Sequence, residues 1–163
     1  MKKIFETYGW EVTNYDAIHQ GLINSTYSIN TAQGDFIVQS INHNVFKDPW
    51  AIDKNINAIG AFLNKTKPDY LFTHLIPNKD QQTLIEWEGG FYRAFHKIEG
   101  YALSVLDTAN QVEEAATQFA QFTSILKEFN AETLIDTLPN FHNLSLRYQQ
   151  FDDALVKGDP TRI

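Results

Sequence analysis

Residues 21–50 constrain the fold of this chain more than any other segment. The run GLINSTYSINTAQGDFIVQSINHNVFKDPW predicts a glycine-led turn, a strand, a tight turn, a further strand and the start of a helix. A weakly alternating segment over residues 10–18 predicts a strand before it. Gly34 can adopt the positive φ of a hairpin turn, and Asp48 followed by Pro49 is typical of a helix N-terminus. We therefore expect antiparallel strands leading directly into a helix.

The remaining elements follow from patterns of apolar residues and turn residues. Three further strands and two helices are expected, over residues 70–76, 82–87, 91–98, 109–130 and 143–157. Glu88, Gly89 and Gly90 predict a second hairpin turn, between the last two of these strands. The change from strand patterns to helix patterns divides the chain into residues 1–98 and residues 99–163. The fold class is therefore α+β, with an antiparallel sheet plus one helix followed by a helical part. Two helices cannot close a domain, and the tail after residue 157 ends without a finished element, so we expect these helices to pack on polypeptide absent from this chain.

Composition excludes several classes of function. The chain has 163 residues and a net charge of −7, and no cluster of lysine and arginine occurs, which argues against a nucleic-acid partner. It has no cysteine, which excludes disulfides, thiolate metal sites and a cysteine nucleophile. No segment approaches the ~20 apolar residues of a membrane span. We expect a cytoplasmic protein that does not bind membranes.

The turn that opens the central run has residues suited to binding phosphate. Glycine and small polar side chains let backbone N–H groups and hydroxyls approach phosphate oxygens. The candidate phosphate-binding residues in this turn are Gly21, Leu22, Ile23, Asn24, Ser25 and Thr26. Taken alone, the same segment is also typical of an ordinary hairpin with a polar turn.

The ordered set of segments resembles the aminoglycoside phosphotransferase and choline kinase superfamily. GLINSTY, FIVQSIN, VFKDPWAIDKNI, YRAFHKIEG and LPNFHNLSLRYQQF are most similar to the branch containing N-acetylhexosamine 1-kinase. The resemblance covers most of residues 15–152. It implies a protein-kinase-like small lobe over residues 1–98 and the linker and first helices of a large lobe over residues 99–163.

The resemblance assigns roles to individual residues. Residues 21–26 match the loop that covers the ATP phosphates. Gln39 stands where most relatives have a phosphate-binding lysine, and a neutral Gln39–Asn55 pair is one replacement for the usual ion pair. Residues 95–100 match the hinge that contacts adenine, in which His96 and Ile98 would contribute backbone groups.

The resemblance also identifies what this chain lacks. Such enzymes use an aspartate loop to position the hydroxyl and acidic or amide ligands for Mg²⁺, and these would follow residue 163. No catalytic residue and no metal ligand is therefore assigned here. The sequence predicts the N-terminal part of a longer ATP-dependent enzyme, and the 163-residue chain alone is expected to be inactive.

Three functional hypotheses remain open. The first is a phosphotransferase acting on a sugar, most simply an N-acetylhexosamine. The second is a non-catalytic nucleotide-binding or protein-interaction module whose exposed face drives self-association. The third is a kinase for an amino alcohol or an aminoglycoside. The small lobe does not discriminate among the substrates because the substrate groups bind elsewhere.

Overall fold

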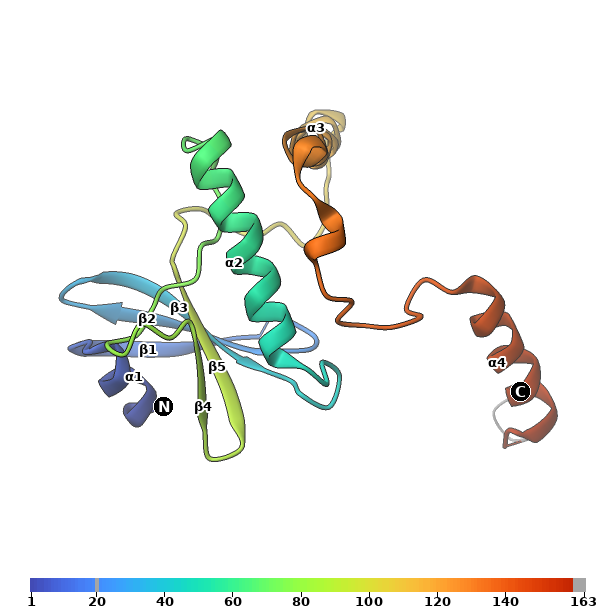
Figure 1. The fold of residues 1–163 in the computed structure, drawn as a ribbon, viewed down its shortest axis with the longest axis horizontal. Helices are drawn as coiled ribbons and strands as arrows, with labels where there is room; N and C mark the ends of the chain where they lie inside the picture. The colour runs from blue at the N-terminus through green and yellow to red at the C-terminus, as the bar shows by residue number, and fades with distance from the viewer. Residues whose placement is uncertain (20, 160–163) are drawn as a thin grey trace.

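The computed structural model describes residues 1–19 and 21–159 of the chain. Gln20, in the predicted break before Gly21, and residues 160–163 of the predicted tail lie outside the described residues. Figure 1 shows a sheet with helices beside it and a helical extension. In chain order the principal elements are α1 (Lys2–Tyr8), β1 (Val12–Ile18), β2 (Ser25–Thr31), β3 (Gly34–Ile41), α2 (Pro49–Thr66), β4 (Leu84–Trp87), β5 (Gly90–His96), α3 (Ala109–Ile125) and α4 (Leu144–Lys157).

All five strands form one antiparallel sheet in the order β1-β2-β3-β5-β4. The two predicted hairpin turns form as expected. Gly34 has a φ of 127°, and the turn between β4 and β5 places Glu88 at φ 49° and Gly89 at φ 74°. Positive φ at both central residues gives a turn whose twist matches that of the strands it joins. The α+β class and the antiparallel sheet predicted from the sequence are confirmed.

The register of the three central strands separates two faces of the sheet. Ile29 on β2, Val38 on β3 and Ala94 on β5 are fully buried. Together with Phe36 and Ile85 they form a core cluster with Ile4, Phe5 and Tyr8 of α1. Because alternate strand residues point to opposite sides, Thr26, Gln39 and Arg93 occupy the other face.

The helix after β3 starts as the sequence predicted. The Asp48 carboxylate accepts a hydrogen bond from the backbone N–H of Ala51 at 3.0 Å, and Pro49 is the first helical residue. A cap of this kind contributes about 1 kcal/mol by satisfying one of the free N–H groups at the helix start. The helix follows β3 after a short connection and lies beside the sheet (Figure 1).

Two features differ from the prediction. The strand expected over residues 70–76 is wrong, because this segment is irregular and joins the sheet at a single bridge between Leu75 and Phe95. The helix α1 was not expected at all. It is short, and only the sheet reveals why it forms: Ile4 and Phe5 are buried against the sheet.

The helical part contributes little to the core. Neither α3 nor α4 has a buried residue. Two aromatic contacts, Tyr70 with Phe122 and Phe62 with Phe129, link α3 and the turn after it to α2 and the segment following α2. By contrast, α4 lies apart from the sheet at the end of an extended connection (Figure 1). Among the described helices, none combines the length and apolar character needed to cross a bilayer.

Tyr8 offers a test of the α1 core. It is 9% exposed, its ring stacks on Trp10, and its hydroxyl is buried without a hydrogen-bond partner among the described residues. Burial accordingly raises the pKa of this hydroxyl, with a smaller contribution from the negative charge of Asp53. A buried unsatisfied hydroxyl costs about 1–3 kcal/mol. Tyr8→Phe should therefore increase the free energy of unfolding by about 1 kcal/mol, measured by urea denaturation.

A matched control is Tyr148→Phe, because Tyr148 is 65% exposed on α4. The free energy of unfolding of Tyr148→Phe should differ from that of wild type by less than about 0.5 kcal/mol. A loss of stability in Tyr8→Phe would show that the hydroxyl has a favourable partner.

Candidate functional site

The sheet face opposite α1 carries an open cavity of about 550 Å³. Its wall includes the end of β1, the middle of β3, the second half of β5 and the segment after β5. The residues that matter here are Ile18, Gln39, Arg93, His96, Ile98 and Gly100. Three of the residues predicted to bind nucleotide, Gln39, His96 and Ile98, are thus brought to one cavity.

The glycine-led turn lines a neighbouring, smaller hollow of about 190 Å³. Gly21, Asn24, Ser25 and Thr26 belong to this hollow, and Ile18 lines both. Leu22 is fully exposed and Ile23 is 47% exposed, so both apolar side chains of the turn reach solvent. The predicted phosphate loop therefore lies beside the larger cavity, at the open edge of the sheet.

At Gly21, the first residue of this turn, the backbone leaves little space for a side chain. A Cβ added to Gly21 would lie 3.3 Å from the backbone oxygen of Asn24, closer than most Cβ contacts. The Asn24 side chain in turn accepts a hydrogen bond from the backbone N–H of Asn42 at 3.0 Å, which ties the turn to the end of β3. These contacts give glycine a steric reason to occupy position 21.

A row of hydrogen bonds connects the turn with the cavity. Gln39 donates from Nε2 to Thr26 Oγ1 at 3.2 Å. Its Oε1 accepts from Nε of Arg93 at 3.1 Å and from Nη2 of Arg93 at 2.7 Å. The three residues are direct cross-strand neighbours on β2, β3 and β5, so the sheet register holds the row in place.

The expected Gln39–Asn55 pair is wrong. Asn55 bonds through both ends of its side-chain amide to the backbone of Ile135, at 2.8 Å from Nδ2 and 2.9 Å to Oδ1. It therefore connects α2 to the segment after α3. Gln39 has Arg93 as its partner instead, because β5 and not α2 places a polar side chain beside it.

Arg93 is the site residue that the sequence reasoning did not find. Two signals were present: it is the only arginine in residues 1–98, and it interrupts the aromatic strand FYRAF. Its position opposite Gln39 depends on the pairing of β3 with β5. That pairing joins segments more than 50 residues apart, so local patterns do not specify it.

The two hinge residues differ in what they present to the cavity. The ring of His96 lies 5.3 Å from the ring of Phe36, on the sheet face away from Gln39. This arrangement agrees with a backbone role for His96, while the side chain of Ile98 is 46% exposed. Gly100 follows at a φ of 147°, which only glycine adopts easily, and ends the hinge segment.

Asp53 of α2 is the carboxylate whose negative charge acts on the pKa of Arg93. Burial raises the pKa of Asp53, while hydrogen bonds from Thr83 and Asn57 and the positive charge of Arg93 act in the opposite direction. Burial also lowers the pKa of Arg93, and Asp53 partly offsets this. Neither Asp53 Oδ1 nor Arg93 Nη1, both buried, has a hydrogen-bond partner among the described residues.

No metal centre is visible in the described part of the chain. Within residues 1–19 and 21–159, no three histidine, aspartate or glutamate side chains come together in a way that could hold an ion. The expectation that Mg²⁺ ligands would come from elsewhere stays a prediction.

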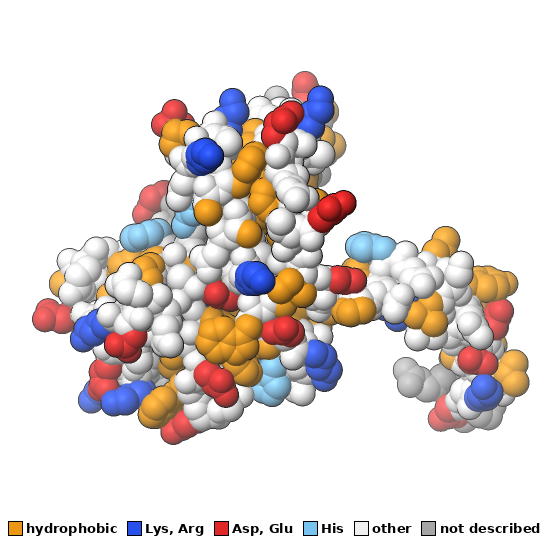
Figure 2. Space-filling view, in the orientation of Figure 1, with side chains coloured by type: hydrophobic (Ala, Val, Ile, Leu, Met, Phe, Trp, Pro, Cys, Tyr) orange, Lys and Arg blue, Asp and Glu red, His pale blue; other side chains and the backbone are white. Residues whose placement is uncertain are grey.

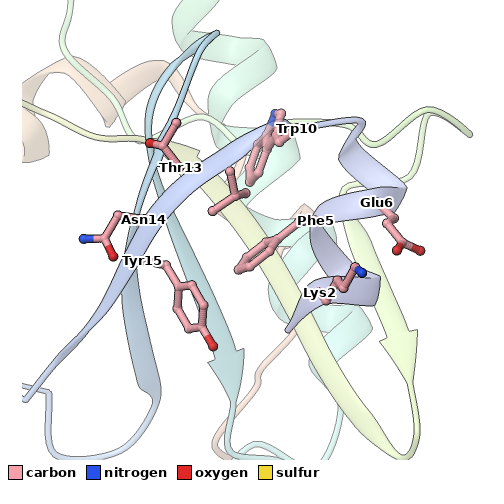
Figure 3. A pocket seen from close by; sticks show the side chains of 8 residues that line it. Lys2, Phe5, Glu6, Trp10, Thr13, Asn14 and Tyr15 are labelled. Atoms are coloured by element: carbon pink, nitrogen blue, oxygen red, sulfur yellow. The ribbon is translucent and has the colours of Figure 1, made fainter.

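A further hollow of about 510 Å³ lies between α1 and β1 (Figure 3). Phe5, Trp10 and Tyr15 line it, with Lys2 and Glu6 along α1. Tyr15 pairs with Ile29 of β2, so the hollow lies on the core side of the sheet and not beside Gln39. It contains none of the predicted site residues.

No protein-family model matches this chain. Its structure is similar to spectinomycin phosphotransferase APH(9)-Ia in complex with ADP and spectinomycin, with a TM-score of 0.57 over 80% of this chain at 10% identity. It is also similar to an aminoglycoside phosphotransferase from Alicyclobacillus acidocaldarius, with a TM-score of 0.67 over 100% of this chain at 10% identity. The chain has the fold of these phosphotransferases. It spans 37% and 45% of their lengths, less than half of each.

The electrostatics of Asp53 lead to a pH-dependent prediction. A carboxyl group whose pKa is raised by folding binds protons more readily in the folded than in the unfolded state. Its contribution to stability therefore falls as the pH rises from the ordinary value of 3.8 through the raised pKa. Asp53→Asn removes this penalty, so the variant should be more stable than wild type at pH 7. The difference should shrink as the pH is lowered to 3.8.

Urea denaturation at several pH values measures this difference. Asp152→Asn on the exposed surface of α4 is the matched control and should show no such trend. An Asp53→Asn variant less stable than wild type at pH 7 would show that attraction to Arg93 outweighs the cost of burial.

Proposed function

We propose that this chain is the nucleotide-binding part of an ATP-dependent phosphotransferase that acts on a small molecule. The observation that carries the proposal is the cavity itself: the hinge segment, the polar row from Thr26 to Arg93 and the neighbouring glycine-led turn lie together on one sheet face. The similarity in fold to a phosphotransferase in complex with ADP supports this reading.

Each part of the cavity suits one part of ATP. The hinge residues His96 and Ile98 would offer backbone groups and an apolar side chain to adenine. Gln39 would donate an amide hydrogen to a phosphate oxygen, and the turn from Gly21 to Thr26 would cover the phosphates with N–H groups and hydroxyls. Mg²⁺, when bound by the complete protein, would neutralise charge on the phosphates.

The chemistry of the complete protein would be in-line transfer of a phosphoryl group to a hydroxyl, with rate enhancement from positioning and charge stabilisation. We propose a sugar, most simply an N-acetylhexosamine, as the acceptor. An aminoglycoside acceptor fits equally well, since one similar structure is a spectinomycin phosphotransferase and the other an aminoglycoside phosphotransferase by name. An amino alcohol is the remaining alternative. We propose that residues 1–98 form the nucleotide lobe and residues 99–163 the start of the acceptor lobe.

A second candidate is an association module, and the surface of α4 supports it. Leu144, Tyr148, Phe151 and Leu155 recur at intervals of four and three residues and are 47–80% exposed. This spacing puts them on one side of the helix, and Figure 2 shows apolar side chains over this part of the molecule. Sedimentation analysis across protein concentrations would show self-association through α4, which Phe151→Glu should abolish.

Nucleotide binding by the 163-residue chain tests the leading proposal. Isothermal titration calorimetry should detect ADP binding, and Gly21→Val should weaken it about tenfold, since the added side chain would displace Asn24 and the loop. Thermal unfolding by circular dichroism provides the control for folding of the variant. Binding that is absent in wild type would refute nucleotide recognition, and formation of sugar-1-phosphate by this chain alone would refute its expected inactivity.

A further inference from the structure

The guanidinium of Arg93 is only partly hydrogen-bonded within the described residues. Its guanidinium donates twice to one oxygen, Oε1 of Gln39, from Nε at 3.1 Å and from Nη2 at 2.7 Å. Its carbon Cζ lies 5.3 Å from the centre of the Phe95 ring. Nη1 is buried and has no hydrogen-bond partner among the described residues. Nε and Nη2 of the guanidinium are thus held by Gln39, while Nη1 has no hydrogen-bond acceptor among the described residues.

The charge of Arg93 is not matched by an anion in contact with it. The ion pairs found in the described part of the chain all involve lysine: Lys3 with Glu6, Lys97 with Asp35 and Lys157 with Asp153. Arginine stays protonated in proteins, and a charge removed from water is costly unless it is paired. The direct partner of Arg93 is a neutral amide. Asp53 acts on Arg93 through its charge but forms no ion pair with it, so an anion in the adjoining cavity would supply the contact that is missing.

The cavity presents Arg93 where such an anion would lie. Arg93 and Gln39 line it side by side, on the face that also carries the hinge residue Ile98. Strand β3, Gly34–Ile41, has neither lysine nor arginine. Lys97 is the other cation of this cavity, but it is exposed and lies 3.7 Å from the carboxylate of Asp35. Arg93, which has no carboxylate of the described residues within ion-pair distance although Asp53 acts on it electrostatically, is therefore the cation of this cavity that a ligand anion could contact.

We propose that Arg93 supplies the positive charge that binds a phosphate group of the nucleotide, with Gln39 as its positioning partner; the inference rests on the proposed nucleotide binding. A planar guanidinium matches the geometry of phosphate oxygens and forms charge-assisted hydrogen bonds with them. Gln39 holds the fork by two hydrogen bonds and is held in turn by Thr26. The site thus places its charge on β5 and only an amide on β3.

The experiment compares ADP with adenosine, which has the same base and ribose but no phosphate. Isothermal titration calorimetry on the 163-residue chain measures both affinities at low and high salt. Arg93→Gln should weaken ADP binding about tenfold or more and leave adenosine binding within about twofold, because only ADP offers an anion to the guanidinium. The salt dependence of ADP binding should disappear in the same variant.

Arg147→Gln is the matched control. Arg147 lies on α4, exposed, with its guanidinium bonded to Gln150 at 2.9 Å, so the same substitution there changes net charge equally without touching the cavity. Its ADP affinity should equal that of wild type. A selective loss of ADP binding in Lys97→Gln instead of Arg93→Gln would place the charge at the hinge and overturn the inference.

Moving the charge back to β3 provides the decisive variant. In Gln39→Lys/Arg93→Gln the cation sits one strand away at the directly opposed position, and ADP affinity should recover relative to Arg93→Gln. This variant and Arg93→Lys, which keeps the charge without the fork, also decide the question if Arg93→Gln does not fold by circular dichroism. The charge role of Arg93 would be overturned if ADP affinity did not recover in the double variant and was also lost completely in Arg93→Lys.

The outcomes separate this inference from the proposed function. If wild type binds adenosine and ADP equally, or Arg93→Gln weakens both ligands alike, nucleoside recognition stands and the phosphate role of Arg93 is wrong. If wild type binds neither ligand, the proposed function fails and the inference fails with it. If only ADP binding depends on Arg93, both stand.

Discussion

The pairing of β2, β3 and β5 is the constraint on which both the core and the candidate site depend. Ile29, Val38 and Ala94 are fully buried on one face of these strands, and Thr26, Gln39 and Arg93 form the hydrogen-bonded row on the other. Because side chains alternate along a strand, a shift of one residue in register would exchange the two sets. The same apolar residues that hold α1 to the sheet therefore also hold the polar row at the cavity.

The polar row shows how a sheet can keep a charge close to a cavity. Arg93 is held by Gln39 and rests near Phe95, so its guanidinium is oriented before any ligand arrives. Preorganised donors of this kind lose little freedom on binding. Asp53 acts on the same region from α2: its negative charge partly offsets the burial that lowers the pKa of Arg93, without a hydrogen bond or ion pair between the two side chains. The balance of charge at this site therefore involves three elements: β3, β5 and α2.

The helical part relates differently to the sheet. Asn55 connects α2 to Ile135 by two hydrogen bonds, and Phe62 contacts Phe129, so the first half of this part is attached to α2. The apolar side of α4, by contrast, is exposed to solvent and not packed against the rest of the described chain. Helices in water gain most of their stability from packing an apolar face. That surface thus marks the place where further polypeptide or a second copy would contribute most.

Elements with local signals could be predicted from the order of the residues alone. Alternating β-formers, the turns at Gly34 and Gly89, and the cap at Asp48 each depend on residues close in the chain, and each appears in the structure. The sequence pattern also led to the α+β class, and the resemblance to phosphotransferases suggested Gln39 and the hinge as candidate site residues. It did not reveal α1, whose seven residues form a helix against the sheet, or the irregular path of residues 70–76.

Which distant residues became neighbours depended on how the whole sheet assembled. Gln39 meets Arg93 and not Asn55 because β3 pairs with β5, across 54 positions of the chain, while Asn55 bonds to a residue 80 positions away. No local propensity encodes such pairings, which arise from burying one face of the whole sheet. For this reason Gln39 and the hinge could be named as candidates from the sequence, and the position of Arg93 beside Gln39 could not.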